Sequence, residues 1–134
     1  MVLIDTYVLV DCLRDVDAGK NWLNRESTET FGIPGVVVME LLMGCRNPAD
    51  LQLTQKLLSR FEVVWPEASE FAQAYELLKS HRLTSGLGIP DFLIAATAVA
   101  RRVRLYTFNL KHFRLISGLD AQQPYSRPQP PLPV

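Results

Sequence analysis

The sequence lacks the features that mark secreted, zinc-binding or membrane proteins. It has two cysteines, Cys12 and Cys45, without the paired spacing of a zinc site or a disulfide framework. The apolar start ends at Asp5, so it is too short for a signal peptide, and no apolar run approaches the length of a membrane span. We therefore expect a reduced, cytoplasmic protein.

A net charge is also absent. Lys and Arg together number 14, and Asp and Glu together also number 14. The molecule as a whole therefore has no net field that would attract or repel a polyanion. Any nucleic-acid site has to arise from local charge.

The chain does contain enough apolar material for one domain. It has 134 residues, of which 48% are hydrophobic, and this suffices for a single buried core. Residues 124–134 include five prolines, a composition typical of an extended chain. We predict a folded domain over residues 1–123 and a disordered proline-rich tail over residues 124–134.

Short β-branched runs alternate with stretches of helical periodicity. This alternation predicts an α/β fold of three layers around a central, mostly parallel sheet of four or five strands. We expect strands at 2–4, 30–33, 62–65 and 103–108, helices at 6–14, 17–26, 36–44, 47–60, 69–82 and 90–102, and a turn with a short closing element at 109–118. In helix 69–82 the spacing predicts Phe71, Ala74, Tyr75 and Leu78 inside and Glu70, Glu76 and Lys79 outside.

Three carboxylates stand at positions where chemistry is expected. Asp5 directly follows the first strand, and ligands of open parallel sheets bind at the carboxyl ends of strands. Glu40 lies within an otherwise apolar helix, where a carboxylate has to be paired, exposed at a crevice or bound to a cation. Asp91 follows Pro90 at the start of the alanine-rich helix. Carboxylate oxygens in such a set suit a hard cation.

Each of these residues also has a purely structural interpretation. Asp5 caps the following helix in that interpretation, Glu40 forms a salt bridge or faces solvent, and Asp91 is an ordinary first-turn aspartate. Asn109, just after the fourth strand, faces the same crevice together with Thr107 or serves only in a turn. These alternatives stay open from the residues alone.

A basic stretch lies close to these carboxylates in the sequence. Between Phe92 and Leu119 there is no Asp or Glu, whereas five cations occur there: Arg101, Arg102, Arg104, Lys111 and Arg114. Such a stretch suits the positioning of phosphates without reading of bases. The alternative for Arg101 and Arg102 is that they only complement the carboxyl end of their helix.

Four motifs carry a resemblance to a known family. They are Leu3-Ile4-Asp5-Thr6-Tyr7-Val8-Leu9, Met39-Glu40-Leu41-Leu42-Met43-Gly44, Asp91-Phe92-Leu93-Ile94-Ala95-Ala96-Thr97-Ala98 and Tyr106-Thr107-Phe108-Asn109-Leu110-Lys111-His112-Phe113. Their order resembles that of PIN-domain nucleases, and most of all that of VapC-type toxins of toxin–antitoxin pairs. The resemblance runs from Met1 to about Leu119.

The resemblance implies a metal-dependent endoribonuclease with catalytic residues Asp5, Glu40, Asp91 and Asn109. It assigns Asp5, Glu40 and Asp91 to an acidic site that holds Mg²⁺ or Mn²⁺. The family often has a fourth acid in the segment where this chain has Asn109 and His112, which puts a second metal ion in doubt.

The resemblance also implies partners. It predicts an RNA substrate, a homodimer and an antitoxin protein bound in a groove between helices, for which Leu51, Leu57, Leu58 and Phe61 are candidate lining residues. The alternative is that these apolar residues, at helical spacing, belong to the core. Two other readings compete with the nuclease. A haloacid dehalogenase-type phosphatase needs an aspartate at position 7, where the chain has Tyr7. A catalytically impaired module acting through protein or RNA binding is favoured by the missing fourth acid.

Overall fold

The computed structural model describes residues 1–25 and 30–127, and a five-stranded sheet runs through its centre. The strands are β1 (Val2–Ile4), β2 (Phe31–Pro34), β3 (Glu62–Val64), β4 (Leu105–Tyr106) and β5 (Ala121–Gln122). Their order is β3-β2-β1-β4-β5, and every pair is parallel. All of β1 is buried. The predicted α/β fold with a parallel sheet is confirmed, with five strands.

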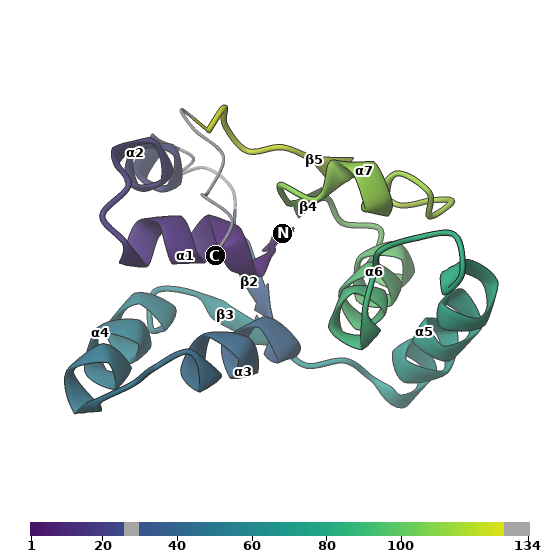
Figure 1. The fold of residues 1–134 in the computed structure, drawn as a ribbon, viewed down its shortest axis with the longest axis horizontal. Coiled ribbons are helices and arrows are strands. Elements are labelled where there is room, and N and C mark those ends of the chain that lie inside the picture. Colours follow the sequence, from purple (N-terminus) through teal and green to yellow (C-terminus); the bar gives the residue numbers. More distant parts are fainter. Residues whose placement is uncertain (26–29, 128–134) are drawn as a thin grey trace.

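The helices form a layer on each side of this sheet. On one side α1 (Thr6–Leu13), α2 (Asp17–Arg25), α3 (Gly35–Met43) and α4 (Pro48–Leu58) pack against one another. On the other side α5 (Ala68–His81) packs along α6 (Ile89–Arg101), and the short α7 (Leu110–Phe113) follows β4 (Figure 1). The three predicted layers are therefore present.

The fourth strand is shorter than the predicted 103–108. α6 ends at Arg101, and the next residue, Arg102, has a left-handed φ of 54°, so the residues after it are needed to bring the chain back to the sheet. Beyond that connection only Leu105 and Tyr106 pair with β1, and the two-residue β5 is their other neighbour. The closing element at 109–118 contains α7, and β5 lies beyond it.

The predicted inner face of helix α5 is right for Ala74, which is buried, and for Leu78, which packs against the core, but wrong for its two aromatic residues. Glu70 is only 4% exposed, whereas Phe71 and Tyr75 lie open to solvent. Arg101 on α6 explains the difference, because its Nε and Nη2 donate to the two Glu70 carboxylate oxygens at 2.9 and 3.1 Å. A buried carboxylate with such a partner is tolerated inside a protein. The helix therefore turns Glu70 towards α6 instead of its aromatic residues.

The chain returns to α1 after the last strand. The Tyr125 hydroxyl donates to the Asp11 carboxylate at 2.7 Å, and Arg127 forms an ion pair with the same carboxylate. Residues 128–134 of the predicted tail and Glu26, the predicted end of helix 17–26, lie outside the described residues. The domain boundary after residue 123 stays a prediction.

No helix in the described ranges combines the length and the apolar character that a membrane crossing requires.

Candidate metal-dependent nuclease site

The strand order creates a crevice at the carboxyl ends of β1 and β4. From β1 the chain moves outwards through β2 to β3 and then crosses back to β4 on the other side of β1. Ligands of open parallel sheets bind at such a reversal, beyond the carboxyl ends of the strands. Asp5 follows β1 and Thr107 follows β4, so these two residues lie across the reversal point.

Asp5 is buried at this point, with 8% of its surface exposed. Its Oδ1 accepts a hydrogen bond from the Thr6 amide at 2.8 Å, and its Oδ2 accepts one from the Thr107 hydroxyl at 2.7 Å. Burial raises the pKa of Asp5, the hydrogen bonds from Thr107 and Thr6 oppose the rise, and the charge of Asp91 adds to it. Asp5 therefore caps α1 and belongs to a charged cluster at the same time.

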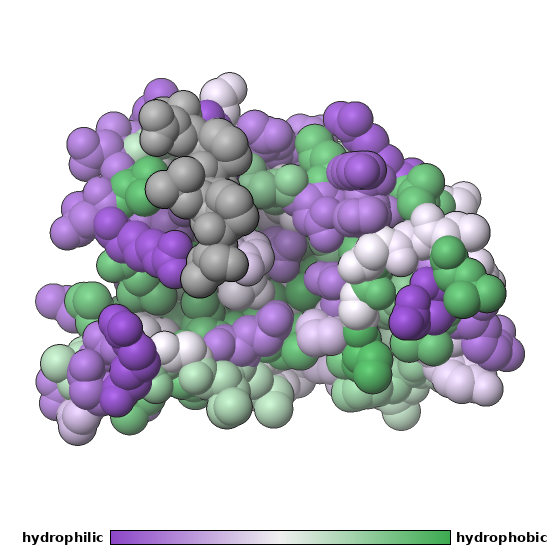
Figure 2. Space-filling view, viewed as in Figure 1, coloured by the Kyte–Doolittle hydropathy of each residue, from purple (hydrophilic) through white to green (hydrophobic). Residues whose placement is uncertain are grey.

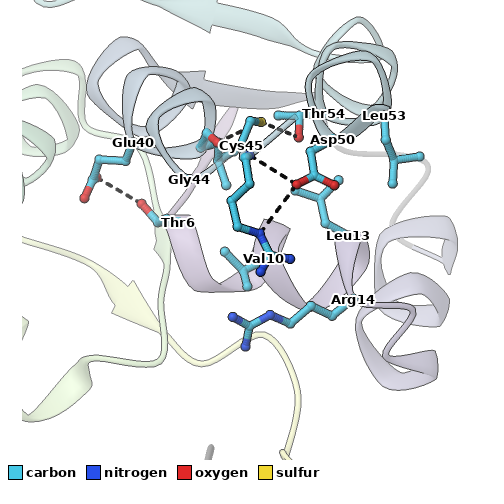
Figure 3. A pocket seen from close by; sticks show the side chains of 12 residues that line it. Thr6, Val10, Leu13, Arg14, Glu40, Gly44, Cys45, Asp50, Leu53 and Thr54 are labelled. Carbon is cyan, nitrogen blue, oxygen red and sulfur yellow. Dashed lines mark hydrogen bonds and ion pairs between the residues drawn. The ribbon is translucent and has the colours of Figure 1, made fainter. Parts of the chain in front are cut away.

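Glu40 reaches the same region from α3. Its side chain is exposed, and its Oε1 accepts a hydrogen bond from the Thr6 hydroxyl at 3.1 Å (Figure 3). Partial burial raises the pKa of Glu40, and the charges of Asp5 and Asp91 raise it further, while the hydrogen bond from Thr6 lowers it. Of the alternatives open from the sequence, the structure shows a carboxylate exposed at the edge of a crevice.

Asp91 occupies the first turn of α6. Its Oδ2 accepts a hydrogen bond from the Gly88 amide at 2.9 Å, which satisfies a donor at the start of the helix. Its charge contributes to the raised pKa values of both Asp5 and Glu40. The fold thus brings positions 5, 40 and 91 into electrostatic reach of one another, and none of the three forms an ion pair with another described residue.

This set has the right chemistry for a hard divalent cation. Its donors are carboxylate oxygens, and a buried carboxylate without a protein cation gains most from a bound ion. The side chains as they stand do not form a closed cage, because no three His, Cys, Asp or Glu residues of the described chain are grouped closely enough to hold a metal. Direct coordination by Asp5, Glu40 and Asp91 therefore stays a prediction.

The segment that departs from the family pattern has structural contacts. The backbone amide of Asn109 donates to the Thr107 hydroxyl oxygen at 3.0 Å, and His112 Nδ1 accepts a hydrogen bond from the Gly86 amide at 3.0 Å. His112 thereby holds the loop that leads to Asp91. The side chain of Asn109 makes no hydrogen bond with other described residues, so its catalytic role stays a prediction.

Two of the five predicted phosphate-binding cations are engaged elsewhere. Arg101 pairs with Glu70, and Arg104 pairs with Asp120 at 3.1 Å. The other three are surface cations that pair with no acidic residue in the described ranges: Arg102, Lys111 and Arg114. Only these three of the five cations therefore remain candidates for binding phosphates.

A cavity of about 510 Å³ opens from the carboxylate site between α1, α3 and α4. Thr6 and Glu40 form the end nearest the site, and Leu53 and Thr54 line it from α4 (Figure 3). The predicted groove residues Leu51, Leu57, Leu58 and Phe61 do not line this cavity, and Leu58 belongs to the core.

Sequence reasoning missed two side chains around the site. Thr6 links Asp5 to Glu40, and Asp11 binds the end of the described chain. The adjacency of Thr6 to Asp5 was a possible signal for the first. The partners of Asp11 lie 114 and 116 residues away, so no local pattern indicates the second.

A family model for the PIN domain matches residues 2–118. The chain belongs to the PIN-domain family. Two curated relatives of this PIN-domain protein come from Mycobacterium tuberculosis. Ribonuclease VapC10 is 31% identical over 121 residues, which are 89% of this chain and 90% of the relative. Ribonuclease VapC19 is 34% identical over 135 residues, which cover 93% of this chain and all of the relative.

A solved structure gives the same result for the fold. It is the crystal structure of VapBC2 from Rickettsia felis bound to a promoter DNA fragment. The match covers 92% of this PIN-domain protein and 98% of that chain, with a TM-score of 0.80 and 26% identity. The predicted family is therefore confirmed over nearly the whole described chain.

Proposed function

We propose that this PIN-domain protein is a metal-dependent endoribonuclease and the toxin of a toxin–antitoxin pair. The observation that carries the proposal is the buried Asp5 at the strand reversal. It interacts electrostatically with Glu40 and Asp91, and it pairs with no cation of the described chain. The curated relatives are named as ribonucleases, which supports the same reading. A cytoplasmic location fits this function.

The carboxylates would hold Mg²⁺ or Mn²⁺. Such an ion makes a bound water more acidic and stabilises negative charge on phosphoryl oxygens. The protein's own part is positional. Thr107 and the Thr6 amide fix the two oxygens of Asp5, the Thr6 hydroxyl orients Glu40, and the Gly88 amide orients Asp91. Arg102, Lys111 and Arg114 would contact phosphates of the RNA without reading bases.

We also propose that the cavity between α1, α3 and α4 receives a segment of the antitoxin. The Rickettsia felis neighbour is a VapBC2 assembly, and a toxin–antitoxin complex from Klebsiella pneumoniae matches 95% of this chain with a TM-score of 0.76 and 26% identity. The walls combine apolar Val10, Leu13 and Leu53 with the cation Arg14, whereas Arg46 pairs with Asp50 at 3.8 Å. This lining suits a peptide with apolar side chains and an acidic group that meets Arg14.

A homodimer is the third part of the proposal. Met39 and Met43 are exposed large apolar side chains on α3, and Figure 2 shows pale green surface over this helix. Exposed apolar patches of this kind mark interaction surfaces. Light scattering of the purified chain should give twice the monomer mass, and Met43→Glu should lower it. A wild-type protein that stays monomeric at all concentrations would contradict this part.

The runner-up function is a catalytically impaired PIN-like module that only binds RNA or protein. The presence of Asn109 and His112 in place of a fourth acid favours it. The two readings differ in whether the purified chain cleaves RNA.

The decisive experiment measures cleavage of total RNA by the purified chain with Mg²⁺, with Mn²⁺ and with EDTA. We expect cleavage with the ions only, and its loss in Asp5→Ala and in Asp91→Ala. Asp17→Ala is the matched control, because Asp17 is also a first-turn aspartate, on α2. Cleavage that survives both site substitutions would refute the site, and none in any preparation would favour the module.

The toxin role needs a separate test in cells. Expression of the chain alone should arrest growth, and co-expression of a neutralising antitoxin should relieve the arrest. Asp5→Ala should be harmless when expressed alone. A wild-type chain that leaves growth unchanged would count against the toxin role while leaving the nuclease activity open.

A further inference from the structure

An exposed aromatic ring lies beside the carboxylate site. Tyr7 is the second residue of α1, two positions after Asp5, and it is 59% exposed. The residues after it, Val8 and Leu9, are fully buried, and Thr6 before it binds Glu40. The backbone at Tyr7 is therefore fixed on both sides while the ring keeps free surface at the edge of the site.

A cation from the end of the described chain accompanies this ring. The Arg127 guanidinium lies 4.1 Å from the centre of the Phe108 ring and 5.9 Å from the centre of the Tyr7 ring. Phe108 follows Thr107 at the end of β4, whereas Tyr7 follows Asp5 and Thr6 at the end of β1. Arg127 thus spans two aromatic residues that flank the crevice.

A buried carboxylate holds Arg127 in this place. Arg127 Nη2 and Nε donate to the two Asp11 oxygens at 2.8 and 3.2 Å, and Asp11 is 8% exposed. The Tyr125 hydroxyl donates to Asp11 as well, and the Tyr125 ring meets Phe108 edge to face at 5.0 Å. Burial, and then the hydrogen bond to Asp11, raises the pKa of Tyr125. Arg127 therefore has one defined position beside the crevice.

We infer that Tyr7, with Arg127 beside it, stacks a nucleobase of single-stranded RNA next to the phosphate at the carboxylate site. The inference rests on the proposed nuclease function and adds a substrate-positioning residue to it. Proteins hold unpaired bases by stacking them on aromatic rings and on guanidinium planes. Stacking tolerates any base, which suits a chain without a base-reading motif.

The surroundings of Tyr7 favour RNA over a protein partner. Tyr7 is not among the residues that line the cavity between α1, α3 and α4, which is the part of the surface that suits a peptide. Its neighbours in the fold are instead the groups that would meet a phosphodiester, namely Asp5 and Glu40 through Thr6, and a fixed guanidinium.

The test measures RNA binding in EDTA, where the strand stays intact. The probe is a short single-stranded RNA that carries 2-aminopurine, whose emission falls when it stacks on an aromatic ring. We expect Tyr7→Ala to raise Kd roughly tenfold and to abolish the quenching. Tyr7→Phe keeps an aromatic ring and should retain both. Melting temperatures of the variants confirm that they are folded.

Tyr75→Ala is the matched control. Tyr75 is 60% exposed and also carries a nearby cation, with Lys79 Nζ at 4.7 Å from its ring centre, but it lies on α5. We expect Tyr75→Ala to bind RNA like the wild type. Equal losses in Tyr7→Ala and Tyr75→Ala would overturn the inference, because any exposed ring would then serve.

Three further outcomes can be told apart. Unchanged Kd and quenching in Tyr7→Ala would refute the stacking role while cleavage by the wild type still supports the nuclease. Weaker capture of a co-expressed antitoxin by Tyr7→Ala, with RNA binding unchanged, would reassign the ring to the protein partner and also overturn the inference. Failure of the wild type to cleave RNA contradicts the proposed function without affecting the binding measurement.

Discussion

Two buried carboxylates in different parts of the molecule, Asp5 after the central strand and Glu70 on α5, behave in opposite ways. Asp5 and Glu70 are 8% and 4% exposed, so the exposed fraction alone does not distinguish them. The pKa of Glu70 is lowered, chiefly by its hydrogen bonds from Arg101, whereas the pKa of Asp5 is raised by burial. The α5–α6 pair supplies its own cation. In the crevice beside β1, no cation of the described chain pairs with Asp5. Glu70 is therefore a structural acid, whereas Asp5 is free to bind an ion.

The largest effect is expected from a substitution that removes the unpaired charge of Asp5 and keeps the shape of its side chain. Asp5→Asn keeps an oxygen that can cap Thr6, so the fold should persist. RNA cleavage should fall roughly a thousandfold, because the ion's contribution to the transition state is worth several kcal/mol. Initial rates at saturating Mg²⁺ measure it. Glu70→Gln is the comparison variant, and its folded fraction should cleave at the wild-type rate. A loss of the same size in both variants would erase the distinction.

The next largest effect is expected when Glu70 loses its cation, Arg101. Arg101→Ala leaves Glu70 buried without its partner, and we expect the free energy of unfolding to fall by roughly 2 kcal/mol, since Arg101 itself is partly in solvent. Urea denaturation at neutral pH measures this change. The double variant Glu70→Ala with Arg101→Ala should recover part of the loss, since no unpaired carboxylate remains. A single variant as stable as the wild type would show that the ion pair contributes nothing.

A smaller effect concerns pH and metal together. The pKa of Asp5 is raised above its ordinary 3.8 in the folded chain, so the metal-free protein loses stability as the pH rises from there through the raised value. Glu70 acts in the opposite sense, because its pKa is lowered below 4.5 and its stabilisation disappears as the pH falls through the folded value. Mg²⁺ should therefore raise the melting temperature more at pH 7 than at pH 4.

At a hundredfold excess over Kd the ion should contribute about 2.7 kcal/mol. Asp5→Asn should lose most of this gain, and Glu70→Gln should keep it. An equal gain at both pH values would mean that the carboxylates do not bind the ion.

The smallest effect adjusts the hydrogen bonds that hold Asp5. Thr107→Val removes the hydroxyl that donates to Asp5 Oδ2 and should lower stability by about 1 kcal/mol. It should also raise the pKa of Asp5 further, which would shift the acid limb of the cleavage profile to higher pH. Thr107→Ser keeps the hydroxyl and should leave the profile in place. A pH profile that is identical in all three proteins would contradict this role of Thr107.

The sequence predicted the position of Asp5 better than that of Glu70. Asp5 stands at the end of an apolar strand, and the topology of a parallel sheet is enough to place it in a crevice. The position of Glu70 depends on Arg101, which is 31 residues away, and the periodicity of its own helix pointed to Phe71 and Tyr75 as the buried face. A pattern within one helix reports its apolar residues and carries no information about a charged partner on another helix.

The same limit applies around the site. That Glu40 and Asp91 come near Asp5 was predictable from their motifs. That Thr6 joins Glu40 to the cluster and that Arg127 reaches Asp11 depends on tertiary contacts that span 34 and 116 residues. Leu58 shows the opposite error, because an apolar residue assigned to a binding groove belongs to the core.

Carboxylate oxygens of Asp5 and Asp91 also accept hydrogen bonds at the starts of two helices. One oxygen of Asp5 receives the amide at the start of α1, and one oxygen of Asp91 receives the amide that precedes α6. If an ion binds these carboxylates as proposed, it should fix the first turns of both helices, one from each layer. Binding of the ion would then slow amide hydrogen exchange at both Thr6 and Gly88. The exchange rates in the two helix layers would therefore change at the same ion concentration.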